Sequence, residues 1–136
     1  MIIRSYQEVD EASVAQLWRT VFPDAPGRNH PETDIRRKLT IQRELFLVAE
    51  LEKNIVGTAM AGYDGHRGWV YYVAVLPEYR QRNIGRELMK RVEHDLKALG
   101  CTKLNLQVRA TNKGVVEFYS KLEYQIEDHV SMGKML

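Results

Sequence analysis

The chain has 136 residues, a length that fits a single domain and can bury a real core. Hydrophobic residues make up 44% of it and charged residues 28%, and the net charge is only +2, which argues against nucleic acid as a partner because such binders carry a clustered basic face. No apolar run approaches the length of a membrane span and the N-terminus lacks a signal-peptide pattern, so we expect a cytoplasmic protein with no membrane partner.

The first third of the chain predicts a short strand and two helices. Residues 2–5 fit the strand, and Asp10 is expected to cap a helix whose apolar face runs from Val14 to Val21. Three prolines and a glycine over 22–31 exclude regular structure there. A second helix is expected to begin at Thr33 or Asp34 and to end near Gln42.

Three strands follow, expected over Leu45–Leu51, Ile55–Ala61 and Trp69–Leu76. A tight turn at 52–54 joins the first two, and the turn G-Y-D-G-H-R-G at 62–68 joins the second and third. The third strand ends in an apolar run, Val73, Ala74 and Val75, without alternation, which is typical of a strand covered on both faces. Pro77 then stops it.

A basic turn over residues 80–83 leads into a helix from Ile84 to Leu99, with Gly100 as its C-terminal cap. A helix start leaves N–H groups unpaired and carries a positive partial charge. Together with the neighbouring arginines, this start is suited to hold a phosphate.

The last part of the chain predicts a strand at Lys103–Arg109, a helix over Asn112–Leu122 and a final strand from Tyr124. Cys101, the single cysteine, is expected to be a buried structural thiol. The resulting order is β-α-α-β-β-β-α-β-α-β. It predicts an α/β (or α+β) fold with a mixed, mostly antiparallel central sheet flanked by about four helices.

The segment V-A-V-L-P-E-Y-R-Q-R-N-I-G, residues 73–85, resembles motif A of the GNAT acetyltransferases, Q/R-x-x-G-x-G/A after a valine-rich strand and a proline. Arg80 matches the first position of the motif and Gly85 the last. Asn83 replaces the middle glycine, and asparagine reaches the left-handed conformation at lower cost than most residues.

A second segment is similar to the GNAT pattern of an asparagine followed by F-Y-x-K-L-G-F/Y. The matching residues are Asn112, Phe118, Tyr119, Lys121, Leu122 and Tyr124. Glu123 stands where glycine is usual, at a cost of about 1 kcal/mol in stability. The element order is also that of the family, and the 62–68 turn is similar to that of a small bacterial subgroup.

The resemblance implies acetyl-CoA as co-substrate and no metal. Its pantetheine arm would pair with Val73, Ala74 and Val75 at the splayed end of the strand. Its pyrophosphate would lie on the turn and helix start formed by Arg80, Gln81, Arg82, Asn83, Ile84, Gly85 and Arg86. Asn112 would touch the cofactor arm, and Tyr119 would lie near the sulfur as general acid. From spacing alone, a core aromatic is the favoured interpretation of Tyr119, and the family match shifts the preference to the acid role.

The general base stays open. Relatives that acetylate protein N-termini carry a glutamate where this chain has Gln107, which cannot take a proton. The alternatives are Asp64, His66 and Glu50, or water held by Tyr71 or Tyr72.

The resemblance therefore implies direct transfer of an acetyl group to a primary amine of a small molecule or peptide. The acceptor is expected to contact the loop and helix over 22–35 and the 62–68 turn, where charged side chains of both signs gather: Asp24, Arg28, His30, Glu32, Asp34, Asp64, His66 and Arg67. A catalytically silent acyl-CoA-binding module is the alternative. An RNA-binding domain is disfavoured by the balanced charge. A homodimer is compatible with the resemblance.

Overall fold

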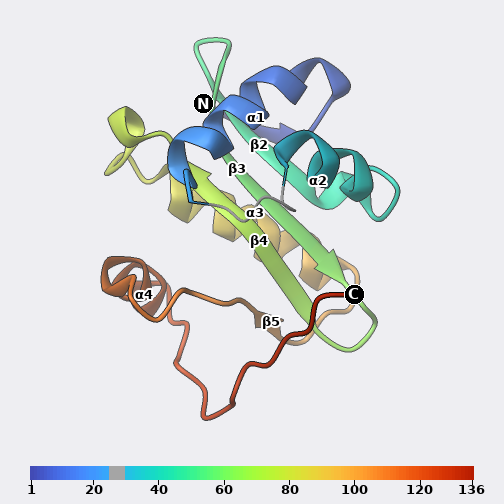
Figure 1. Ribbon diagram of the computed structural model, residues 1–136, viewed down its shortest axis with the longest axis vertical. Coiled ribbons are helices and arrows are strands. Elements are labelled where there is room, and N and C mark those ends of the chain that lie inside the picture. Colours follow the sequence, from blue (N-terminus) through green and yellow to red (C-terminus); the bar gives the residue numbers. More distant parts are fainter. Residues whose placement is uncertain (25–29) are drawn as a thin grey trace. The chain divides into compact units, whose positions relative to one another are not determined.

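The computed structural model describes residues 1–24 and 30–136 (Figure 1). The chain divides into two compact units, Met1–Leu106 and Gln107–Leu136. The expectation of one domain over 1–136 stays a prediction. Among the described residues, no helix is long and apolar enough to cross a membrane.

The first unit is built on a five-stranded sheet in the order β1-β2-β3-β4-β5. Its strands are β1 (Ile2–Ser5), β2 (Phe46–Leu51), β3 (Asn54–Tyr63), β4 (Gly68–Val75) and β5 (Leu104–Asn105). All neighbours are antiparallel except β4 and β5, which are parallel. The predicted mixed, mostly antiparallel sheet is therefore confirmed.

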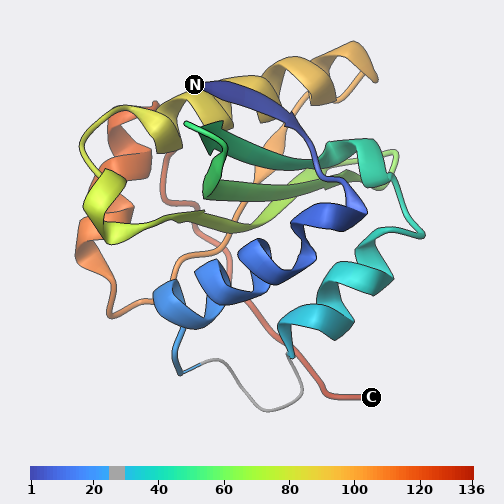
Figure 2. The same cartoon turned by 90° about the horizontal axis from the view of Figure 1, so that it is seen from above.

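Three α-helices belong to this unit: α1 (Glu11–Val21), α2 (Pro31–Lys38) and α3 (Ile84–Ala98). Short 3-10 turns, η1 (Glu8–Asp10), η2 (Arg43–Leu45) and η3 (Pro77–Tyr79), join elements of the same unit. α1 and α2 cover one face of the sheet and α3 the other (Figure 2). The fourth helix, α4 (Lys113–Lys121), lies in the second unit.

The core of the first unit is aromatic on the α1 side and closely packed on the α3 side. The rings of Tyr6 and Phe46 stack at 4.7 Å between centroids. On the opposite face, a Cβ added to Gly57 would lie 3.0 Å from the Ala74 carbonyl oxygen and 3.1 Å from a Leu88 methyl group. Glycine at this position therefore lets α3 pack closely against β3.

The expected start and end of the second helix are wrong. The helix begins at Pro31, because a proline at the first helical position has its φ already set and needs no N–H partner. It ends at Lys38, and Gln42 takes a left-handed backbone with φ of 49°. The Gln42 side-chain amide then pairs with the backbone N–H and carbonyl of Tyr63, at 2.8 and 3.0 Å.

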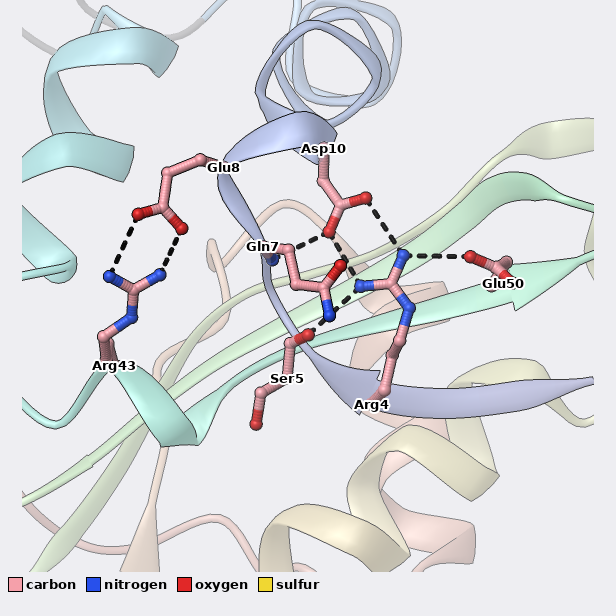
Figure 3. A network of polar contacts seen from close by, with 7 residues as sticks. All are labelled: Arg4, Ser5, Gln7, Glu8, Asp10, Arg43 and Glu50. Atoms are coloured by element: carbon pink, nitrogen blue, oxygen red, sulfur yellow. Dashed lines mark hydrogen bonds and ion pairs between the residues drawn. The ribbon is translucent and has the colours of Figure 1, made fainter.

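Asp10 does not cap α1 with its side chain, which corrects a second expectation. Its carboxylate accepts two hydrogen bonds from the Arg4 guanidinium, at 2.8 and 3.0 Å, and one from the Gln7 N–H at 2.8 Å (Figure 3). Arg4 also donates to Glu50 at 2.9 Å. Burial raises the pKa of Asp10, but Arg4 and the Gln7 N–H outweigh it, and the pKa is lowered overall. The network ties β1 and β2 to the start of α1.

The end of β4 is less covered than predicted. Ala74 is buried, whereas Val73 and Val75 are half-buried, so the expectation of full cover on both faces is wrong. Cys101 is half-buried rather than buried, and its thiol donates to the Lys103 carbonyl at 3.3 Å.

Two expected strands in the last part of the chain are wrong. The predicted strand over 103–109 is reduced to Leu104–Asn105, which pairs only with Gly68 and Trp69. As the structure describes it, 122–136 contains no strand. An alternating pattern defines two faces, but a strand also needs a partner for its backbone. The helix predicted over 112–122 is confirmed as α4.

Candidate active site

β4 carries a bulge at the position where the family resemblance places the cofactor arm. Thr58 of β3 pairs with Ala74, but Met60 pairs with Tyr71, so two residues of β4, Tyr72 and Val73, lie opposite one residue of β3. A bulge bends its strand and re-aims the backbone groups beside it. Tyr72 adopts φ of 52°, a costly conformation for a non-glycine residue.

Tyr72 is fixed at its backbone, ring and hydroxyl. The Thr58 hydroxyl donates to the Tyr72 carbonyl at 2.8 Å and accepts from the Trp18 indole N–H at 2.9 Å. The Trp18 ring stacks on the Tyr72 ring at 3.7 Å between centroids. The Tyr72 hydroxyl donates to Asp34 Oδ2 of α2 at 2.6 Å. These contacts hold a strained backbone that would otherwise relax.

The environment of Tyr72 also decides its protonation. Burial, followed by the hydrogen bond to Asp34, raises its pKa well above the usual value. The phenol therefore keeps its proton at neutral pH and donates a hydrogen bond to the Asp34 carboxylate. A water held by Tyr71 or Tyr72 as the base stays a prediction.

The basic turn after β4 is shaped by two left-handed residues. Gln81 and Asn83 both adopt φ of 63°, so Asn83 takes the left-handed conformation that the sequence allows at the motif glycine position. Arg80 Nε donates to the Val75 carbonyl at 3.2 Å, at the end of β4. The Arg82 guanidinium lies 5.2 Å from the centre of the Tyr79 ring, a cation–π distance.

The start of α3 lacks a side-chain cap. Asn83 is the N-cap residue but makes no capping hydrogen bond, and the first intrahelical bond runs from the Glu87 N–H to the Asn83 carbonyl at 3.0 Å. The N–H groups of the preceding helical residues, 84–86, thus have no partner within the helix. Ile84 is buried and anchors the turn, while Arg80, Arg82 and Arg86 are exposed. This arrangement suits a phosphate.

The two other predicted site residues belong to α4, in the second unit. Asn112 caps this helix, because its Oδ1 accepts from the Val115 N–H at 3.4 Å. The Tyr119 ring lies edge-on to Phe118 at 4.9 Å and to Tyr124 at 5.7 Å. Burial raises the pKa of Tyr119 to about 12, so its phenol is protonated at neutral pH. The structure thus gives Tyr119 both the surroundings of a core aromatic and the protonation that an acid needs.

The remaining candidates for the general base differ in their hydrogen-bond partners, ion pairs and exposure. The Asp64 carboxylate accepts from the Arg67 and His66 N–H groups, each at 2.7 Å, which lowers its pKa and marks it as a turn former. Glu50 is paired with Arg4. His66 and Tyr71 are exposed, and Gln107 donates to Ser131. Among the described residues no group of three His, Cys, Asp or Glu side chains could hold a metal ion.

The charged side chains expected to meet the acceptor also differ in the partners that they have. Glu32 is paired with Arg19 at 2.6 Å, while Asp24 and His30 are exposed and Arg28 lies outside the described residues. Among the described members of this group, Asp34 alone bonds to the bulge residue Tyr72. Sequence reasoning missed the part that Thr58 plays. A lone threonine in the apolar run I-V-G-T-A-M-A was the available signal, since a buried hydroxyl needs partners.

The chain is similar in sequence to known acetyltransferases. The sequence matches the acetyltransferase (GNAT) family over residues 12–124. It is 47% identical to an acetyltransferase of Yersinia pestis and 46% identical to one of Pectobacterium atrosepticum, in both cases over all of this chain and 96% of the relative.

Solved structures share the fold at low identity. An aminoglycoside 6'-N-acetyltransferase from Acinetobacter haemolyticus gives a TM-score of 0.81 at 18% identity, covering 100% of this chain and 99% of that one. The enzyme AAC(6')-Iy, solved with a CoA-linked bisubstrate analogue, gives 0.82 at 18% identity, covering 99% and 97%. These likenesses confirm the predicted fold class.

Proposed function

Because this chain belongs to the GNAT acetyltransferase family, we propose that it transfers an acetyl group from acetyl-CoA to a primary amine of a small molecule or peptide by direct attack. Family membership makes it an acetyltransferase enzyme and bears out the resemblance seen in the sequence. The identity of the donor and the amine character of the acceptor are the parts proposed here.

The binding of acetyl-CoA is supported by the segment from β4 to α3. β5 pairs with β4 only at Gly68 and Trp69, so among the described residues no strand pairs with the rest of that edge of β4, and an amide-bearing arm is suited to it. The uncapped start of α3, with Arg80, Arg82 and Arg86 exposed beside it, suits the pyrophosphate. We assign Asn112 to the cofactor arm on the motif match alone.

Acetyl-CoA supplies an activated acyl group as a thioester. The backbone N–H groups at the bulge are suited to polarise the thioester carbonyl as the amine attacks. The new C–N bond forms as the C–S bond breaks, the amine loses one proton and the departing sulfur gains one, a transfer that we assign to Tyr119 on the motif match alone. Burial raises the pKa of Tyr119 to about 12, so its phenol carries a proton at neutral pH. The amine must arrive neutral, and its proton passes to water or to a base not yet identified.

The single observation that carries the proposal is the strained Tyr72 at the β4 bulge, followed after η3 and the basic turn by an uncapped helix start. The silent-module alternative rests on Asn83 and Glu123 at usual glycine positions and on Gln107 where relatives carry a glutamate. Asn83 and Glu123 adopt the left-handed conformation that a glycine would, with φ of 63° and 73°, so neither disrupts its turn. The names of the relatives likewise favour the enzyme.

The test is release of free thiol from acetyl-CoA in the presence of a panel of monoamines, diamines and peptides. We expect release that depends on the amine and saturates with it. Binding of acetyl-CoA without thiol release for any amine would establish the silent module instead. The single domain over 1–136 is supported by a family match that crosses the boundary at Leu106, while the cytoplasmic location and a homodimer stay predictions.

A further inference from the structure

We infer that Asp34 binds a second cationic group of the acetyl acceptor, so that the preferred acceptor carries two amino groups. The inference rests on the proposed function, since it concerns the acceptor of that reaction. It draws on contacts within the first unit alone.

The first step is the placement of the Asp34 carboxylate. It lies on α2, half-buried, and its Oδ2 accepts the Tyr72 hydroxyl at 2.6 Å. Tyr72 is itself held by the Trp18 ring and by Thr58 at the bulge. The carboxylate is therefore fixed relative to the backbone groups of β4 that we assign to the thioester. A pre-positioned and partly desolvated carboxylate binds a cation more strongly than an exposed one.

The second step compares Asp34 with the other carboxylates of this region. Glu32 pairs with Arg19 at 2.6 Å, and Glu11 pairs with Arg36 at 2.9 Å, so an arginine balances each of these charges. Asp64 is bound by the N–H groups of its own turn. Among residues 1–24 and 30–136, the partner that the structure gives Asp34 is a neutral phenol, and this contact leaves the negative charge for a ligand to balance.

The third step is the separation between the carboxylate and the bulge. Asp34 contacts the hydroxyl at the tip of Tyr72, whereas the thioester would lie at the Tyr72 backbone, a full tyrosine side chain away. A cation bound at Asp34 is therefore not the nitrogen that attacks. The attacking amine must be neutral, while the group at Asp34 stays charged, which is the pattern of a short flexible diamine.

The experiment compares 1,4-diaminobutane with butylamine, which differ only in the second amino group. We expect the wild type to prefer the diamine in kcat/KM. Asp34→Asn, which keeps the shape of the side chain, should lower the ratio of the two kcat/KM values about tenfold, mainly through the KM for the diamine. Glu11→Gln removes a carboxylate that also links α1 and α2, and should leave the ratio unchanged.

Tyr72→Phe supplies a second variant in case Asp34→Asn folds poorly. It keeps the ring that stacks on Trp18 but frees the carboxylate, and should lower the ratio severalfold. Equal use of diamine and monoamine by the wild type, or an unchanged ratio in both variants, would overturn the inference while leaving acetyl transfer intact. Absence of thiol release with every amine would instead overturn the proposed function.

Discussion

The two helices α3 and α4 each begin after an asparagine, yet the two asparagines do different things. Asn112 caps its own helix, with its side chain accepting from the Val115 N–H. Asn83 adopts φ of 63° and caps nothing, so the start of α3 keeps its N–H groups for a ligand. The comparison teaches that the backbone conformation of the residue, rather than its chemical type, decides whether a helix start is closed or open.

The ends of the same helices share one geometry with different residues. In α3 the Gly100 and Cys101 N–H groups bond to the carbonyls of Lys97 and Leu96, at 3.0 and 3.1 Å. In α4 the corresponding bonds run from Glu123 and Tyr124 to Ser120 and Tyr119, both at 3.0 Å. This is the glycine-type C-terminal cap, and α4 forms it with a glutamate at φ of 73°. α4 therefore ends under strain that α3 avoids.

The largest expected effect is on α4. Tyr119→Phe keeps the ring packed against Phe118 and Tyr124 but removes the proton that we assign to the departing sulfur. Turnover should fall by roughly 10²–10⁴, while affinity for acetyl-CoA changes little. Steady-state kinetics and a binding measurement on the same preparation test this. Unchanged turnover would reduce Tyr119 to a core aromatic.

The next effect concerns the open start of α3. Asn83→Asp places a carboxylate at the start of α3, where it would repel a pyrophosphate and should weaken acetyl-CoA binding by at least about tenfold. The same charge favours the helix dipole, so the free energy of unfolding should not fall. Asn54→Asp is the matched control, because it adds the same charge at an exposed asparagine at the start of β3, to which we assign no ligand. Equal losses of affinity in both variants would contradict the assignment of the pyrophosphate to the open start of α3.

The start of α1 supplies a third case, in which an aspartate is bound by an arginine. The Asp10 pKa is lowered, so its stabilising contribution is present above the unfolded pKa, near 4, and is lost as the pH falls through the folded value. Asp10→Asn should cost roughly 2 kcal/mol at neutral pH and flatten the acid side of the stability profile. Urea unfolding at a series of pH values measures both. A variant profile parallel to the wild type would exclude this role.

The smallest effects concern the two helix ends. Glu123→Gly should stabilise the protein by about 1 kcal/mol, because it relieves a left-handed glutamate. Gly100→Ala should destabilise it by a similar amount, since φ is 89° there and no side chain crowds the position. Chemical denaturation should show that the two substitutions change the free energy of unfolding in opposite directions. Changes in the same direction would mean that one of the two caps is not formed as described.

The same features explain what could be predicted from the sequence. Apolar periodicity placed the α3 helix correctly, and the glycine at 100 marked its end, because both signals are local. The Pro31 start was missed because a proline is compatible both with a loop and with the first position of a helix. The strand over 103–109 was overextended because alternation does not reveal a partner.

The candidate site also has one part with a local sequence signal and one part without. The turn from Arg80 to Arg86 could be predicted because its residues are contiguous and carry a motif. The bulge at Tyr72 could not, since it depends on Thr58, Trp18 and Asp34, which lie far apart in the sequence and meet only in the fold. Tyr72 and Asp34 were each candidates, but their hydrogen bond had no local signal.

The central claim is that the open start of α3 binds acetyl-CoA, and thermal unfolding with and without acetyl-CoA tests it most directly. A ligand at a hundred times its dissociation constant adds about 2.7 kcal/mol of stability, which should raise the midpoint by roughly 2–8 °C. The account predicts this shift for the wild type and a much smaller one for Asn83→Asp at the same concentration. No shift of the wild type at millimolar acetyl-CoA, or an equal shift in both proteins, would contradict it.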